Sequence, residues 1–258
     1  MLWAVVGVLL ALLAETLAGV PVPGWGLAAA LLVLAGAVTV GVVSQASGVF
    51  ARPLVRVQTS RPEVALTFDD GPDAQVTPLV MAALEARGHR GTFFVIGDRA
   101  RSQQDLIGQL VRRGHGLGNH SLRHSSLTPF TNPRTLAAEL GACGDLIEAA
   151  AGQRPRWFRP PVGLLSPRVA EGAARAGLDL VAWTASARDG RPGRSVAGAL
   201  ARIEPHLKPG AILVLHDGRL GAQGDSSVLL ILEAVLDRLE ALGLRSVRLD
   251  RLVDPGQP

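Results

Sequence analysis

The sequence predicts a parallel α/β domain that follows an apolar N-terminal region, and three observations support this. The chain has 258 residues, enough for one large domain beside a membrane segment. From residue 63 onward, short apolar runs alternate with amphipathic helical stretches, a pattern typical of parallel sheets. Polar residues suited to catalysis follow several of the apolar runs, where parallel α/β enzymes place their active sites.

The first 51 residues contain a single charged side chain, Glu15. Residues 1–20 and 27–44 are apolar, and a Pro/Gly-rich break separates them at Pro21–Gly26. Each run is close to the roughly 20 residues that cross a bilayer. We therefore predict an N-terminal transmembrane helical hairpin with Trp25 at the membrane interface. A cleaved signal peptide is disfavoured, because no basic residue precedes the first run and a second run follows at once.

The chain is accordingly divided into a membrane anchor (1–44), a linker (45–62), a folded domain (63–252) and a C-terminal tail (253–258). The orientation of the domain stays open at this point. Arg52, Arg56 and Arg61 follow the second span, so the positive-inside rule favours a cytoplasmic domain.

Strands and helices are expected to alternate along the folded domain. The expected strands are Glu63–Phe68, Thr92–Ile96, Leu117–His120, Arg156–Phe158, Leu180–Trp183, Ala211–Leu215 and Arg245–Leu249. The expected helices are Thr77–Arg87, Ser102–Arg113, Asn132–Ala151, Pro167–Ala176, Ser195–Ile203 and Ser227–Leu242. A threonine cap is expected at Thr77, with Pro78 in the first turn.

Composition excludes some functions. The basic residues are Lys208 and scattered arginines without an aromatic stripe, so nucleic-acid binding is not predicted. The single cysteine, Cys143, cannot form an intrachain disulfide, and we expect it to be a packed core residue.

Two adjacent carboxylates, Asp69 and Asp70, end the first strand in the run Thr67–Gly71 (TFDDG). Neighbouring side chains at a strand end point in different directions, so one can bind a metal while the other acts as a base. The alternative is that one of them caps the following turn.

Two histidines four residues apart, His120 and His124, follow the third strand. On one face of a helical turn this spacing can bind one divalent ion, and a carboxylate would complete a site with open positions. Two solvated loop histidines are the alternative. His89 and His115 lie beside glycines and are expected to be structural or exposed, and His206 has no evident partner.

Polar residues also follow two further expected strands. Arg159–Gly163 (RPPVG) has a backbone stiffened by prolines, so Arg159 can be held against a carboxylate and nearby amides can bind an oxyanion; a surface loop is the alternative. His216, in Leu213–Gly218, can act as a general acid, and Asp189 is a candidate to raise its pKa. Asp189 is otherwise a turn residue before Gly190.

Together these segments resemble the NodB-homology polysaccharide deacetylases, carbohydrate esterase family 4. The resemblance covers about residues 62–252, and Gly91–Gly97 (GTFFVIG) and Gly114–His120 (GHGLGNH) are also similar to that family. TFDDG and HSxxH in this order are a specific signal. The resemblance implies a distorted (β/α) barrel with seven or eight strands.

The resemblance also implies roles and a cofactor. Asp70, His120 and His124 would hold a divalent metal, usually Zn2+, with Co2+, Ni2+ or Mn2+ as alternatives. Asp69 would be the general base, positioned by Arg159. His216 would be the acid that protonates the leaving amine, tuned by Asp189. The backbone near Pro161 and Val162 would help to bind the oxyanion.

The sequence departs from the family pattern in aromatic residues. Val162 stands where an aromatic residue often precedes the glycine, Asp189 is followed by Gly190 where tryptophan is common, and the chain contains no tyrosine. Aromatic surface on which sugars stack is thereby reduced, whereas the metal and proton-transfer residues are retained.

Three functions follow as hypotheses. The first is N-deacylation of an amino sugar in a cell-surface glycan such as peptidoglycan or an exopolysaccharide, which requires a membrane-anchored domain outside the cytoplasm. The second is deacylation or deformylation of a lipid-linked sugar at the cytoplasmic membrane face. The third is a catalytically inactive glycan-binding relative.

Overall fold

The computed structural model describes residues 24–43, 47–189, 195–218 and 227–256, with a few residues between 7 and 18. Within these residues a parallel sheet has the order β5-β4-β3-β2-β1-β7-β6, with β8 paired to β1. The strands are β1 Glu63–Asp69, β2 Gly91–Val95, β3 Gly116–Asn119, β4 Trp157–Phe158, β5 Asp179–Leu180, β6 Ala185–Ser186, β7 Ile212–His216 and β8 Arg245–Ser246.

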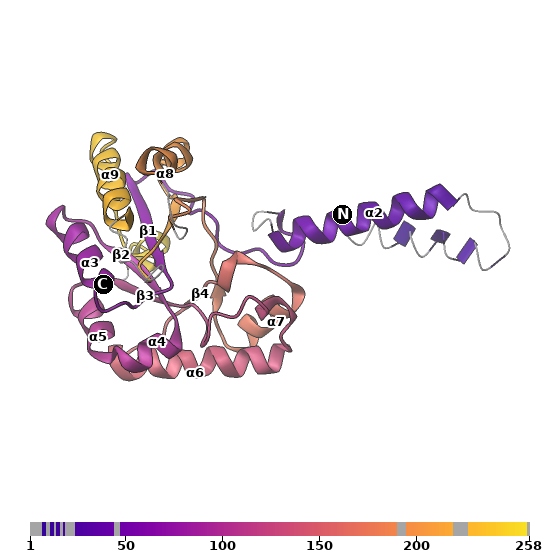
Figure 1. The fold of residues 1–258 in the computed structure, drawn as a ribbon, viewed down its shortest axis with the longest axis horizontal. Coiled ribbons are helices and arrows are strands. Elements are labelled where there is room, and N and C mark those ends of the chain that lie inside the picture. The colour runs from indigo at the N-terminus through magenta and orange to yellow at the C-terminus, as the bar shows by residue number, and fades with distance from the viewer. Residues whose placement is uncertain are drawn as a thin grey trace.

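Helices cover the outside of the curved sheet (Figure 1). They are α3 Val76–Ala86, α4 Gly97–Ser102, α5 Gln104–Arg112, α6 Pro133–Ala151, α7 Pro167–Arg175, α8 Val196–Ile203, α9 Ser227–Ala241 and α10 Leu249–Val253. Short 3-10 turns, η2 Thr128–Phe130, η3 Pro161–Gly163 and η4 Glu204–His206, lie in the connections. This arrangement confirms the predicted parallel α/β fold of the distorted (β/α) barrel type.

The two ends of the sheet, β5 and β6, are bridged by residues that precede the domain. Leu54 N–H donates to Leu180 O at 2.8 Å, and Ala182 N–H donates to Leu54 O at 2.8 Å. Val57 N–H donates to Gly210 O at 2.9 Å, next to the end of the sheet that carries β7. Residues 54–57, from the segment predicted as a linker, therefore fill the opening of the barrel.

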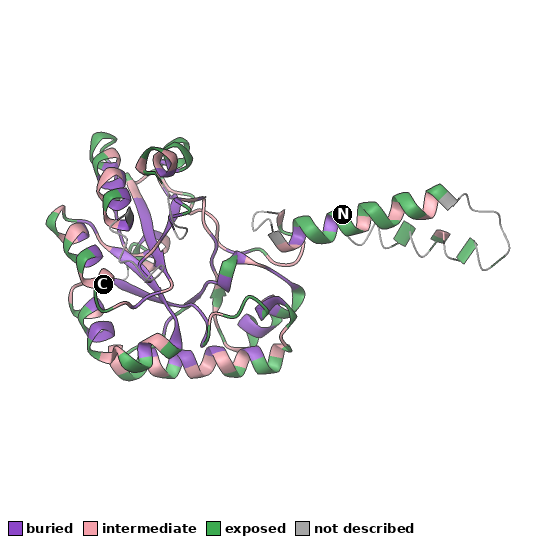
Figure 2. Cartoon of the chain, viewed as in Figure 1, coloured by how far each residue is buried: buried purple, intermediate pink, exposed green. Residues whose placement is uncertain are grey.

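The core lies on both faces of the sheet, which explains why its strands are continuous apolar runs. Strand residues such as Leu66 and Leu213 are fully buried, and Phe68 stacks on Phe93 beneath the outer helices. A second cluster around Phe94 and Ile212 fills the interior of the barrel. Buried strands and outward-facing exposed helix residues are visible in Figure 2.

Several predicted element boundaries are wrong. The helix expected over Ser102–Arg113 is broken at Gln103. This residue has a φ of −132° and separates α4 from α5. The strand expected over Leu180–Trp183 ends at Leu180, and β6 follows separately. The strand expected over Arg245–Leu249 ends at Ser246, because Leu249 already begins α10.

The predicted cap at Thr77 is also wrong. Thr77 lies inside α3, and its hydroxyl donates to the buried carboxylate of Asp217 at 2.5 Å. The helix start is instead stabilised by Asp73, whose Oδ1 accepts from Gln75 N–H at 2.8 Å and from Val76 N–H at 3.0 Å. The threonine thus connects α3 to the end of β7.

Helix α2, Gly24–Val43, is apolar and largely exposed. Its segment Trp25–Val42 has a mean hydropathy of 2.1 and only 11% of it is buried, so its length and composition suit a membrane span. In Figure 1 it projects away from the domain. Most of the predicted first span, residues 1–20, lies outside the described residues, so the transmembrane hairpin stays a prediction.

Candidate active site

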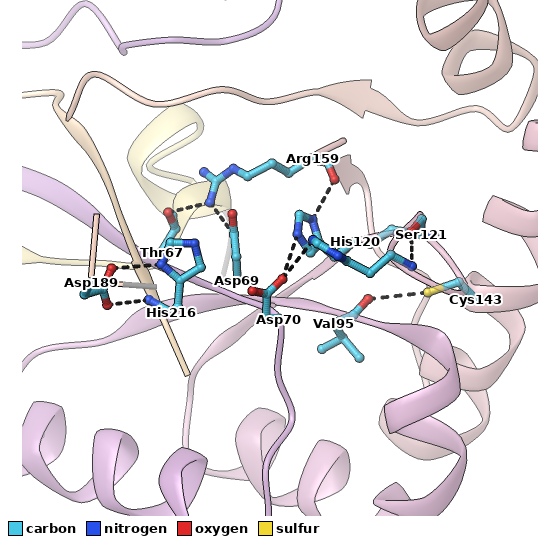
Figure 3. A network of polar contacts seen from close by, with 12 residues as sticks. Thr67, Asp69, Asp70, Val95, His120, Ser121, Cys143, Arg159, Asp189 and His216 are labelled. Carbon is cyan, nitrogen blue, oxygen red and sulfur yellow. Dashed lines mark hydrogen bonds and ion pairs between the residues drawn. The ribbon is translucent and has the colours of Figure 1, made fainter. Parts of the chain in front are cut away.

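The polar ends of four strands meet at one edge of the sheet. Asp69 and His216 are direct partners in the parallel register of β1 and β7. Asn119, just before His120, pairs with Val95 on β2 and with Phe158 on β4, so His120 and Arg159 leave the sheet side by side. The strand order therefore brings together residues that are far apart in the sequence (Figure 3).

Asp70, His120 and His124 converge as predicted for a metal site. His120 Nε2 lies 3.3 Å from Asp70 Oδ1, and His124 Nε2 lies 3.1 Å from the same oxygen. All three donor atoms lie within 4.8 Å of one another. Zinc bonds of about 2.0–2.2 Å place neighbouring ligands of a tetrahedral site about 3.3 Å apart, so the trio fits such an ion.

Hydrogen bonding around the trio also fits a cation. His120 Nδ1 lies 2.7 Å from the carbonyl oxygen of Arg159, which can only accept, so Nδ1 carries a proton and Nε2 is left as the ring atom that can bind a metal. The facing Asp70 Oδ1 is buried and accepts no hydrogen bond within the described residues. A divalent ion between His120 Nε2 and Asp70 Oδ1 would give both atoms a partner.

The charge state of Asp70 agrees with this. Burial alone would raise the pKa of the Asp70 carboxyl, but the adjacent imidazoles of His120 and His124 outweigh burial and hold that pKa well below its ordinary value. Asp70 is therefore a carboxylate throughout the physiological range.

The two histidines do not lie on a helical turn, so this part of the prediction is wrong. The chain from His120 to His124 is an irregular loop. Asn119 Oδ1 accepts from Ser121 N–H at 2.9 Å, and Ser121 Oγ accepts from His124 N–H at 3.0 Å. Because these side chains replace helical backbone bonds, the loop can fold both imidazoles toward Asp70.

Backbone strain is concentrated at this edge of the sheet. Among the described residues other than glycine, a positive φ occurs at Asp70 (71°), Ser121 (69°), His124 (54°), Val162 (58°) and Arg188 (52°). The first four lie in the predicted site, and the fifth immediately precedes Asp189. Such conformations are costly for residues with a Cβ and persist where the surrounding structure imposes them, typically at functional sites.

Asp69 is held by Arg159, as predicted. Arg159 Nη1 donates to Asp69 Oδ1 at 2.7 Å and to Thr67 Oγ1 at 2.8 Å, while Nη2 donates to Ala182 O at 3.0 Å. The guanidinium is fully buried and lies 4.1 Å from the centre of the Phe94 ring. Asp69 thus points away from Asp70, and its Oδ2 has no hydrogen-bond partner among the described residues (Figure 3).

His216 is held by Asp189, as predicted. Asp189 Oδ1 lies 2.8 Å from His216 Nδ1, and Asp189 Oδ2 accepts the backbone N–H of His216 at 2.8 Å. Burial lowers the pKa of His216, but the hydrogen bond and charge of Asp189, aided by the charges of Asp69 and Asp70, raise it overall to about 9. The imidazole is therefore protonated at neutral pH, with Nε2 as its remaining donor.

Pro161 and Val162 lie in η3, next to Arg159. Pro161 is buried and has no N–H, so of these two residues only Val162 can donate a backbone hydrogen bond. Val162 has left-handed backbone angles, and 61% of its surface is exposed.

Sequence reasoning assigned no role to Asp217, although it follows His216 directly. Its carboxyl group is fully buried, its Oδ2 accepts from Thr77, and its N–H donates to Asp69 O at 3.1 Å. Burial raises its pKa to about 7; the Thr77 hydrogen bond opposes this rise, and the nearby charges of Asp70 and Asp69 add to it. The sequence signal for Asp217 was its position: it is a carboxylate directly after the candidate acid His216, at the end of a strand.

Asp217 also explains a glycine at the centre of the site. A Cβ on Gly71 would lie 2.4 Å from Asp217 Oδ2, so only glycine lets the chain after Asp70 pass this carboxyl group.

The remaining histidines and the cysteine lie outside the site. His89 and His115 are buried rather than exposed; His89 Nδ1 accepts from Ser246 N–H at 2.9 Å, and His115 Nε2 lies 3.0 Å from Glu85 Oε1. His206 is exposed. Cys143 is buried, and burial raises the pKa of its thiol to about 12, which suits a packed residue.

Known proteins resemble this chain in sequence and in fold. Residues 56–181 match the family model described as polysaccharide deacetylase. A chitooligosaccharide deacetylase from Bradyrhizobium sp. (strain ANU 289) is 40% identical over 159 residues, which cover 60% of this chain and 70% of that protein. The solved Bc1960 peptidoglycan N-acetylglucosamine deacetylase is 25% identical with a TM-score of 0.70, and the match covers 77% of this chain and 91% of that one.

A second solved structure resembles the chain to a similar degree. The family 4 acetyl xylan esterase from Clostridium thermocellum, in complex with a cobalt ion, is 29% identical with a TM-score of 0.67, covering 76% of this chain and 93% of that one. By its sequence and its fold, this chain belongs to the polysaccharide deacetylase family of hydrolases.

Proposed function

We propose that this chain removes the acetyl group from N-acetylglucosamine units of a glycan related to peptidoglycan or chitooligosaccharides. The names of the relatives support this substrate class. The arrangement of Asp69, His216 and the Asp70–His120–His124 trio supports the reaction, because amide hydrolysis needs an activated water, a base and an acid at one carbonyl.

We propose zinc as the resident metal, held by Asp70, His120 and His124. One carboxylate and two imidazoles are a ligand set that zinc accepts, and the related esterase solved with cobalt supports a divalent ion in this fold. When bound, such an ion lowers the pKa of a coordinated water to about 7 and polarises a carbonyl oxygen.

Asp69 is the proposed base. Its Oδ2, left free by the contact between Oδ1 and Arg159, accepts a proton from the attacking water. The buried guanidinium fixes the carboxylate in one orientation. The backbone N–H of Val162 is proposed to donate to the oxyanion that develops on the acetyl carbonyl.

His216 is the proposed acid. Asp189 holds Nδ1, so the protonated Nε2 faces the site and donates its proton to the sugar nitrogen as the C–N bond breaks. The products are acetate and a free amine.

The observation that carries the proposal is the approach of both imidazole Nε2 atoms to one oxygen of Asp70. The test is acetate release from N-acetylated chitooligosaccharides by the full chain before and after chelation. Activity should be lost on chelation and restored by zinc. Zinc binding without acetate release from any N-acetylated sugar would instead support the inactive glycan-binding alternative.

We further propose that α2 anchors the chain in a membrane and that the catalytic domain lies outside the cytoplasm, where peptidoglycan is found. Lipid-linked sugar deacylation at the cytoplasmic face is the second candidate, favoured by the arginines after α2. A reporter fused after Pro258 decides between the two, since a reporter inside the cell excludes a cell-wall substrate.

A further inference from the structure

The C-terminal end of α2 is fixed to the catalytic domain. The last carbonyl groups of a helix lack partners within it, and Val42 O, one of these, accepts from Leu165 N–H at 3.0 Å. Val49 and Phe50 pack over the last turn so closely that a Cβ on Gly41 would lie 2.6 Å from the Phe50 ring. The helix therefore joins the domain at a defined place.

That place borders the candidate active site. Leu165 lies six residues after Arg159, a stretch that spans at most about 21 Å even when fully extended. Arg159 contacts Asp69 through its guanidinium and His120 through its carbonyl. In Figure 1, α2 projects from the side of the domain that carries α7, which begins just after Leu165.

Three large apolar side chains are exposed beside the same segment. Leu127 is 66% exposed, Phe130 72% and Val162 61%, and we call these three residues the apolar rim. Val162 belongs to η3, whereas Leu127 and Phe130 lie on or beside η2.

The rim is tied to the end of α2 through the start of α7. Ser166 Oγ donates to Pro129 O at 2.8 Å, and Arg168 Nη1 donates to Phe130 O at 2.7 Å. The segment that receives α2 at Leu165 thus also holds η2, and η2 follows the candidate metal ligand His124 by only a few residues. The helix end, the rim and the site form one continuous region.

We propose that the apolar rim rests on the surface of the bilayer that α2 spans, so that the active site opens at the membrane. Exposed phenylalanine and leucine beside arginine are the composition of interfacial contacts, since the apolar groups enter the acyl boundary and the cation binds headgroups. An anchored domain brings this surface to the lipid without a further loss of translational freedom.

This location implies a substrate class, and that part of the inference rests on the proposed function. Among glycans that contain N-acetylglucosamine, the preferred substrates are those still attached to a membrane lipid, because a site that opens at the bilayer reaches such sugars directly. The absence of tyrosine and the valine at position 162 agree with this, since long glycans are usually bound on aromatic surfaces.

Depth measurements test the membrane contact independently of activity. The full chain is placed in nanodiscs of phosphatidylcholine and phosphatidylglycerol, with a spin label at Phe130→Cys or, as a control, at Leu242→Cys. Leu242 is also an exposed leucine, beyond the end of α9. We expect the label at 130 to be relaxed more by oxygen than by a water-soluble nickel chelate, and the label at 242 the reverse. Aqueous behaviour of both labels would overturn the proposal.

Kinetics test the substrate class. The double variant Leu127→Ser/Phe130→Ser is compared with Leu79→Ser/Leu242→Ser on a soluble chitooligosaccharide and on N-acetylglucosamine attached to a lipid in vesicles. The rim variant should lose about tenfold or more with the lipid-attached sugar and stay within about twofold on the soluble one. The control variant should change neither rate, and thermal unfolding of each variant checks that it is folded.

Two other outcomes would contradict either the membrane contact of the apolar rim or the proposed function. An equal loss on both substrates would make the rim part of the sugar-binding surface and overturn the membrane contact. If the unaltered chain hydrolyses neither substrate, the proposed function fails, and the depth measurement alone then decides whether the rim meets the bilayer.

Discussion

Asp69 and His216 face one another as direct partners on the adjacent parallel strands β1 and β7. Each is held from behind by a buried, oppositely charged residue, Asp69 by Arg159 and His216 by Asp189. The proposed base and acid are therefore positioned by the same pair of strands. Arg159 and Asp189, which bind them, can each be replaced separately.

Replacing the proposed base should stop turnover without releasing the metal. Asp69→Asn keeps the shape of the side chain and its contact with Arg159, but it removes the proton acceptor, so kcat should fall by about 10²–10⁴-fold. Acetate release and metal content of the purified variant measure the two effects. Asp73→Asn, altered at the start of α3, serves as a control for loss of a nearby carboxylate. A variant at position 69 with a near-normal rate would exclude Asp69 as the base.

Replacing Asp189, which binds His216, should shift the pH dependence of activity. Asp189→Asn removes the charge that raises the pKa of His216 to about 9, so that pKa should fall. Because the acid must be protonated, the alkaline limb of kcat/KM should move to lower pH. Titration of the His216 ring by NMR in the metal-free protein gives the pKa directly. An unchanged alkaline limb would show that another group is the acid.

The same pKa has a consequence for stability. The folded pKa of His216 lies above the ordinary value of 6.5, so protonation of His216 stabilises the fold fully below about pH 6.5. This contribution is lost as the pH rises through about 9. In Asp189→Asn the corresponding part of the pH dependence of unfolding should shrink, as denaturant titrations across this window can measure.

Removing one imidazole should weaken metal binding strongly. His124→Ala leaves Asp70 and His120 as a two-ligand site, and metal affinity should fall by at least about 100-fold. His206→Ala is the matched control, because His206 is exposed and far along the chain in η4. Metal content and calorimetric zinc titration distinguish the two variants. Equal zinc affinity in both would contradict the proposed ligand set.

Removing the buried guanidinium should destabilise the fold. Arg159→Leu leaves Asp69 buried without its partner and leaves Ala182 O without its donor, at a cost of about 3–5 kcal/mol in the free energy of unfolding. Arg159→Lys keeps the charge but cannot reach Asp69, Thr67 and Ala182 together, so it should cost less and still lower kcat. Chemical denaturation measures the stabilities. A stability of Arg159→Leu equal to wild type would contradict a stabilising contact between Arg159 and Asp69.

Removing the charge of Asp217 should stabilise the metal-free protein at alkaline pH. Because its folded pKa of about 7 exceeds the ordinary value of 3.8, ionisation of Asp217 costs stability progressively between these values and fully above about pH 7. Asp217→Asn retains an acceptor for the Thr77 hydroxyl and removes that cost. Denaturation in chelator should show equal stabilities near pH 4 and a more stable variant above pH 7; the reverse order would contradict the raised pKa.

The sequence alone predicted the alternation of strands and helices and the partners within the site. Buried parallel strands are continuous apolar runs, so Glu63–Phe68 and Ala211–Leu215 were recognised within one residue of their ends. The contact of Asp189 with His216 was expected from the residues, because it joins opposite charges at strand ends, whereas the contact of Arg159 with Asp69 was implied by the resemblance to the deacetylase family.

The rest depends on tertiary contacts that leave little local signal. Two-residue strands such as β6 are defined by their neighbours rather than by their own composition. The left-handed backbone at Asp70, Ser121 and His124 occurs at residues that do not prefer it, so the helical turn expected from the His120–His124 spacing was wrong. Asp217 acquires its unusual pKa only through burial beside the other carboxylates.

The segment around Leu54–Val57 has a practical consequence for any soluble version of this enzyme. Its backbone occupies the gap between the two ends of the sheet, and Thr184 Oγ1 donates to Val55 O at 2.8 Å from the opposite side. Trimming the chain at residue 62 would therefore uncover strand edges that invite aggregation. Trimming between Val43 and Leu54 would remove α2 while leaving the sheet closed.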